Sequence, residues 1–201
     1  MPQTADRDAL AVTARLREAV AGSGLTQAGF ARALGTSASR FSTYLSGTTK
    51  PSAQLFLRAE RLAGALRRAD AQGLMTAPGT ALALRDELHR DDLAWTWRML
   101  LQGRDHLRLM LAGSDEELLG SWEAAPGRTG SVGFDALLAA LAGNEFEVAG
   151  LSAPAWTHTS PLDPPWSPEH PFLSPARVAA QAPEWLRALN IFVPERDLVT
   201  A

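Results

Sequence analysis

Polar side chains between residues 38 and 50 have the types and spacing needed to hydrogen-bond to DNA. The run ASRFST at 38–43 combines small and hydroxyl-bearing residues with one arginine and one phenylalanine. Hydroxyls bond to several bases and to phosphate oxygens, whereas arginine in the major groove favours guanine. The residues of this region that we expect to face DNA are Ala38, Ser39, Arg40, Ser42, Thr43, Thr48 and Lys50.

Two short helices joined by a tight turn must position these side chains. Apolar residues at helical spacing predict a first helix over 27–34, capped by Thr26, and a second over 38–46, capped by Ser37. Gly35 lies between them and can take the left-handed conformation that ends a helix. The apolar side of the second helix then turns inward, which leaves its small polar residues on the outer face. This pattern predicts a helix-turn-helix.

The ordered set of residues resembles the lambda-repressor and Cro type of helix-turn-helix, in the xenobiotic-response-element family. The matching residues, within roughly 9–68, are Leu25, Thr26, Gln27, Ala31, Leu34, Gly35, Ser37, Phe41, Ser42, Gly47, Pro51 and Ser52. The resemblance implies a DNA-binding domain of four to five helices, a phosphate contact by Gln27, and base contacts by Ala38, Ser39, Thr43 and neighbouring residues. It adds Thr26, Gln27 and Ser37 to the expected DNA-binding set. Gly29 and Leu45 depart from the family pattern.

The amino-acid composition and the missing motifs exclude several classes of site and function for this protein. The 201 residues contain no cysteine, so disulfides, thiolate zinc sites and cysteine nucleophiles are absent. The sequence has no apolar run of membrane-spanning length and no signal-peptide pattern, which predicts a cytoplasmic protein without a membrane partner. The four histidines stand alone, and no phosphate loop or nucleophile elbow occurs. We therefore expect no catalytic residues, no metal and no cofactor, and a protein that is not an enzyme.

The charge is divided unevenly along the chain. Residues 1–70 hold ten basic and five acidic residues, whereas the remainder holds nine basic and seventeen acidic residues. A basic lobe attracts the phosphate backbone, and an acidic lobe does not. We therefore predict a DNA-binding domain at 1–70 that binds duplex DNA by itself, a linker at 71–79, and a helical dimerisation or partner-binding domain at 80–201.

The expected C-terminal domain is helical, with one long proline-rich loop. Leucine and tryptophan spacing predicts helices up to about Val148, with a break or corner at 89–92 and a capping box formed by Ser114 and Glu117. Seven prolines between 154 and 175 exclude a helix there. The predicted fold class is therefore all-α.

Three aromatic side chains of the proline-rich segment form the second expected site, which would bind a protein partner: Trp156, Trp166 and Phe172. Tryptophan and phenylalanine are common interface anchors, and proline holds such a segment extended before binding. The alternative is a clasp in which these rings are buried against their own domain.

Two functions compete. The first is a transcriptional repressor that acts on its own operon as a homodimer on a double-stranded operator, because a second recognition helix multiplies specificity. The second is an antitoxin whose acidic lobe neutralises a basic protein toxin while its other lobe autoregulates. The strings SWEAAPG, PAWT and NIFVPERDL are similar to helical domains of actinobacterial antitoxin-like regulators. Either function predicts DNA binding.

Overall fold

The structure is a computed structural model that describes residues 3–113 and 115–199, with side chains from Arg7 onward. Within these residues the secondary structure is ten α-helices and two short 3-10 helices, without a strand, which confirms the predicted all-α class. No helix in the described ranges combines the length and apolarity needed to cross a bilayer. The chain forms two compact units, unit 1 (1–79 and 113–127) and unit 2 (80–112 and 128–201).

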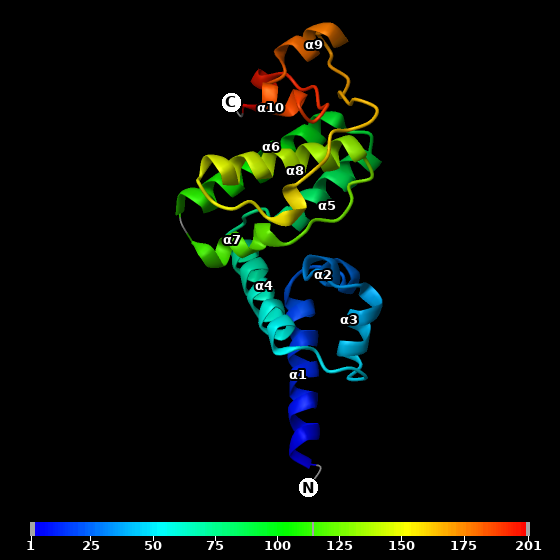
Figure 1. The fold of residues 1–201 in the computed structure, drawn as a ribbon, viewed down its shortest axis with the longest axis vertical. Helices are drawn as coiled ribbons and strands as arrows, with labels where there is room; N and C mark the ends of the chain where they lie inside the picture. The colour runs from blue at the N-terminus through cyan, green and yellow to red at the C-terminus, as the bar shows by residue number, and fades with distance from the viewer. Residues whose placement is uncertain (1–2, 114, 200–201) are drawn as a thin grey trace. The chain divides into compact units, whose positions relative to one another are not determined.

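Unit 1 is a helical bundle that contains the helix-turn-helix. Its helices are α1 (Gln3–Gly22), α2 (Gln27–Ala33), α3 (Ala38–Leu45), α4 (Ala53–Ala71) and α7 (Glu116–Glu123). Figure 1 shows α2 and α3 joined by a short turn beside α1 and α4. The rings of Phe30 and Phe41 are fully buried at a centroid distance of 5.7 Å. Burial of these apolar faces holds the short helices in place, because helices of this length are marginal by themselves.

Local signals set both ends of α2 and α3 and the start of α4. The hydroxyls of Thr26, Ser37 and Ser52 accept hydrogen bonds from backbone N–H groups three residues later, at 3.1, 3.2 and 3.2 Å. Gly35 has a φ of 72° and Gly47 a φ of 76°, a left-handed conformation that glycine adopts without strain. The capping predictions for α2 and α3 are thus confirmed, and Ser52 caps α4 in the same way.

One helix of unit 1 comes from far along the chain. Residues 113–127 return to pack α7 on α4, an arrangement that the expected domain at 80–201 did not include. The Trp122 side chain is fully buried, and its Nε1 donates to the Met75 carbonyl at 3.0 Å. Gly120 allows the close approach, since a Cβ there would lie 3.3 Å from that of Ala65. This return could not be predicted because no local signal specifies a partner fifty residues away.

The ends of α7 and α4 also differ from expectation. Ser114, the predicted cap of α7, lies outside the described residues, and the Asp115 carboxylate accepts from the N–H groups of Glu117 and Leu118, each at 3.2 Å. The α4 helix continues to Ala71 and α5 begins at Ala77, so the non-helical connection is 72–76 rather than 71–79.

Unit 2 is built around one helix that is buried on nearly all sides. Its elements are α5 (Ala77–His89), α6 (Leu93–Gly113), α8 (Val132–Val148), η1 (Ala155–Thr157), α9 (Pro175–Gln181), α10 (Glu184–Arg187) and η2 (Glu195–Leu198). Most of α8 is apolar and buried, which is typical of a central helix. Its buried Glu145 accepts from Arg108 at 2.8 Å, and this hydrogen bond raises the pKa of Arg108 above its ordinary value.

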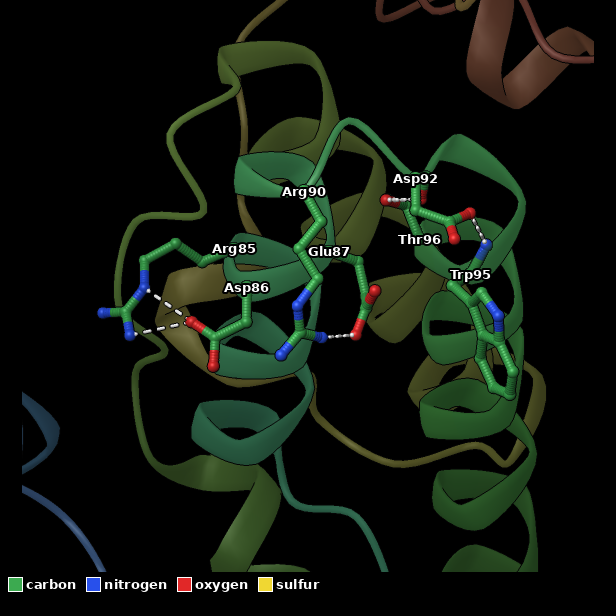
Figure 2. A network of polar contacts seen from close by, with 7 residues as sticks. All are labelled: Arg85, Asp86, Glu87, Arg90, Asp92, Trp95 and Thr96. Carbon is green, nitrogen blue, oxygen red and sulfur yellow. Dashed lines mark hydrogen bonds and ion pairs between the residues drawn. The ribbon is translucent and has the colours of Figure 1, made fainter.

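The break expected at 89–92 is a corner between α5 and α6. Figure 2 shows the Asp92 carboxylate accepting from the Trp95 N–H, at 2.9 Å, which caps α6. The Thr96 hydroxyl donates to the Asp92 carbonyl at 2.8 Å. Arg90 reaches back to Glu87 at 2.5 Å. Asp91, with a φ of 57°, makes the left-handed turn.

The proline-rich segment wraps over α8 and is pinned to the C-terminal residues. Trp166 lies on Gly133, where a Cβ would come within 2.1 Å of the indole ring. The Trp166 and Phe134 rings meet edge to face at 5.1 Å. The backbone of Trp166 donates to the Asn190 carbonyl and accepts from the Phe192 N–H, each at 2.9 Å. Trp166 is therefore packed into its own unit.

Candidate nucleic-acid interface

The α3 helix presents one polar face that is clear of the core. Phe41 and Tyr44 point inward and are 0% and 5% exposed. The opposite face is exposed at Ala38, Ser39 and Ser42. Because these side chains are small, a duplex can approach the α3 backbone closely, as a recognition helix in the major groove requires.

Several hydroxyls of the expected set already bond to the protein. The Thr26 and Ser37 oxygens cap α2 and α3, and Ser37 also lies 3.2 Å from the Ser39 hydroxyl. Thr43, which is half-buried, donates to the Arg40 carbonyl at 2.8 Å. Thr48 lies 2.8 Å from the Ser46 hydroxyl. These groups keep acceptor lone pairs for DNA, but their first role is to hold the two helices and the following loop.

The side chains left for DNA are fewer than the expected set. In the parts of the chain that the structure describes, the side chains of Gln27, Ser42 and Lys50 are exposed and make no hydrogen bond or ion pair with the protein. Arg40 is also exposed, and its Nε donates to the Tyr44 hydroxyl at 2.8 Å. The two Nη nitrogens of Arg40 have no other protein partner among the described residues.

Two arginines that the sequence analysis did not single out brace the helix-turn-helix from other helices. Arg17 of α1 donates to the Leu45 carbonyl at 2.6 Å, and Arg58 of α4 donates to the Leu34 carbonyl at 3.3 Å. Both carbonyls lie at helix C-terminal ends, where cations are favourable. No spacing in the sequence reveals such contacts, because each crosses more than twenty residues.

The charge of unit 1 is more balanced than the first seventy residues suggest. The return of 113–127 adds four acidic residues, which leaves unit 1 with ten basic and nine acidic residues. Two of them hold Arg68 on the α4–α7 side, with Asp115 at 2.7 Å and Glu117 at 2.5 Å. Attraction to phosphate therefore depends on where the remaining basic residues lie, more than on the net charge.

The expected partner-binding aromatics are not presented together. Trp166 is half-buried against Gly133, as described above, and Trp156 is half-buried in η1. Phe172, by contrast, is 87% exposed. The packing of Trp166 favours the clasp alternative for that residue, and Phe172 keeps the features of an interface anchor.

Comparison with known proteins identifies the first part of the chain. Residues 11–88 match a family model described as a helix-turn-helix domain. No curated protein and no solved structure matches the chain. The chain thus has an N-terminal helix-turn-helix DNA-binding domain, and the match extends past the expected boundary at residue 70 into α5.

Proposed function

We propose that this protein, whose helix-turn-helix lies within residues 11–88, is a sequence-specific transcriptional regulator that binds double-stranded DNA and represses its own operon. The observation that supports this most is the outer face of α3, where Ser39, Ser42 and the Arg40 guanidinium are exposed. The opposite face of the same helix is packed into the core of unit 1. This function needs no catalytic group, metal or cofactor, and it places the protein in the cytoplasm.

In the proposed complex α3 enters the major groove. Arg40 and Ser42 contact base edges, while Gln27 and Lys50 contact phosphates on either side. A single helix of eight residues reads only a few base pairs. We therefore propose a homodimer on a palindromic operator of the lambda-repressor and Cro type, with half-sites about one helical turn apart.

Binding to the region upstream of the protein's own gene tests the proposal. The full-length chain should protect a two-fold symmetric site in a footprint, and the Gln27→Ala, Arg40→Ala double variant should not. Arg85→Ala is the matched control, since Arg85 is an exposed arginine of unit 2. A promoter reporter should rise on deletion of the gene and fall when the wild type is restored. A double variant that protects the site normally would refute the assigned face.

The antitoxin function has one observation in its favour. Unit 2 holds nine basic and thirteen acidic residues, a balance that suits a basic protein partner. Its test is co-expression with any small reading frame adjacent to the gene. An antitoxin requires that the frame alone arrest growth and that the full chain relieve the arrest. A harmless neighbour contradicts this function and leaves the repressor proposal intact.

A further inference from the structure

Unit 2 carries a hollow of about 760 Å³ beside its most exposed aromatic residue. The hollow lies between the first turns of α6, the loop at 168–172, α9 and the C-terminal residues. Its walls are mainly apolar, with Leu93, Trp97, Pro171, Phe172, Val178 and Val199 among them. Phe172 and Val199 are 87% and 67% exposed. Apolar side chains this exposed beside a hollow mark a surface that a partner covers.

The loop that carries Phe172 is held in one conformation. The His170 Nδ1 accepts from the backbone N–H groups of Phe172 and Leu173, each at 3.0 Å. The His170 Nε2 lies 3.2 Å from an Asp197 carboxylate oxygen of η2. Because the imidazole ties the loop to a separate segment, the phenyl ring is presented before any partner arrives. An anchor ordered in advance loses little entropy on binding.

Charges of opposite sign border the same hollow. Glu169 is exposed and makes no ion pair within the described part of the chain. The Arg196 side chain is 59% exposed, and its Nε lies 3.6 Å from Asp197. This face therefore carries two complementary pairs of features. One pair is a projecting phenyl ring and a hollow, and the other is a negative group and a positive group. This is what an interface between two identical surfaces requires.

We propose that a second copy of this chain covers the face through a two-fold axis. Each Phe172 enters the hollow of the other copy, and each Glu169 pairs with the Arg196 of the other copy. The inference rests on the proposed function, which requires a homodimer. It assigns the surface through which the two copies associate.

Sedimentation velocity of the full-length protein without DNA, over a concentration series, tests the phenyl contact. Phe172→Ala should raise the dimer dissociation constant by about tenfold or more, as for an interface anchor. The helix content should stay unchanged, since the ring is almost fully exposed. Val132→Ala is the matched control, because Val132 is an apolar residue of unit 2 that is 67% exposed and does not line the hollow. Equal dissociation constants for Phe172→Ala and the wild type overturn the proposal.

Charge exchange tests the two-fold arrangement. Glu169→Arg and Arg196→Glu should each weaken the dimer, because each places like charges opposite one another, and the double variant should restore it. A double variant as weak as the single ones overturns the proposed pairing. A wild-type protein that is monomeric at all concentrations, or whose hollow binds a different protein instead, overturns the proposal as a whole.

A duplex with a single half-site separates this proposal from the function. Monomeric Phe172→Ala should bind it as the wild type does, because the proposed DNA contacts all belong to unit 1. A wild-type protein that binds no DNA contradicts the proposed function, whereas normal half-site binding with no dimer contradicts only this surface.

Discussion

At the scale of single residues, the hydrogen bond of Arg40 to Tyr44 prepares Arg40 for the base contact that we propose. Its Nε is bound to the hydroxyl of buried Tyr44, at the next turn of α3. An arginine pairs with guanine through two N–H groups, and the two Nη nitrogens supply that number. In the proposed complex Tyr44 is therefore a positioning residue, and its hydrogen bond reduces the entropy that Arg40 loses on binding.

Loss of the Arg40 side chain should weaken operator binding more than loss of the Tyr44 hydroxyl that positions it. Arg40→Ala should weaken binding to the operator by about 1 to 3 kcal/mol. Tyr44→Phe, which keeps the ring and loses one hydrogen bond, should cost about 0.5 to 1.5 kcal/mol. Fluorescence anisotropy with operator and random duplexes measures both. An equal loss on the random duplex would show that Arg40 contacts phosphate instead of a base.

Gln27 and Lys50 should differ in their salt dependence although both are assigned to phosphate. Lys50→Ala should lower the slope of log affinity against log salt by about 0.9, because one cation no longer displaces a counterion. Gln27→Ala should weaken binding to all sequences with the slope unchanged, since an amide carries no charge. Titrations at four salt concentrations distinguish the two. A slope that Lys50→Ala does not alter would remove Lys50 from the interface.

At the scale of elements, α7 completes unit 1, although the sequence predicts that this domain ends at residue 70. Ala124 at its end is 2% exposed and belongs to the same apolar core as Phe30 and Phe41. A fragment of residues 1–70, expected from the sequence to bind DNA by itself, lacks this cover over α4. We therefore expect that fragment to be less stable than the intact protein, which weakens any DNA binding measured with it.

Trp122 should dominate the contribution of α7. Trp122→Ala should lower the free energy of unfolding of unit 1 by about 3 to 5 kcal/mol, because it leaves a cavity and removes the hydrogen bond to the Met75 carbonyl. Glu123→Ala, an exposed change on the same helix, is the control and should have little effect. Thermal unfolding followed by circular dichroism measures both. A melting curve that Trp122→Ala leaves unchanged would show that α7 does not support the domain.

At the scale of the whole molecule, we expect acidic residues to limit non-specific attraction to DNA. The chain has a net charge of −3, and unit 1 is nearly balanced. Glu116 and Glu123 are exposed on α7 and make no ion pair within the described residues. They contribute negative field without an evident structural contact, so they should reduce association with any duplex.

Reversal of these two charges should change affinity without changing sequence preference. Glu116→Lys with Glu123→Lys should strengthen binding to random DNA at low salt, because long-range attraction increases. The ratio of operator to random affinity should fall accordingly, while the footprint stays in place. Anisotropy at low and high salt measures this. A displaced footprint would indicate that α7 lies in the interface itself.

The helix-turn-helix could be predicted from local sequence signals alone. The hydroxyl caps at Thr26 and Ser37 and the left-handed Gly35 act within three or four residues, so their positions in the chain specify their partners. The all-α class followed for the same reason, because helical periodicity is local. The exposed polar face of α3 could be read from the same pattern.

Contacts between residues far apart in the chain became visible only in the folded structure. It brought α7 onto α4, placed Arg17 and Arg58 on the helix ends beside the turn, and packed Trp166 on Gly133. These contacts depend on shape and burial between segments that are far apart in sequence, for which no local pattern exists. The same long-range packing separated half-buried Trp166 from exposed Phe172, two aromatics that look alike in a proline-rich sequence.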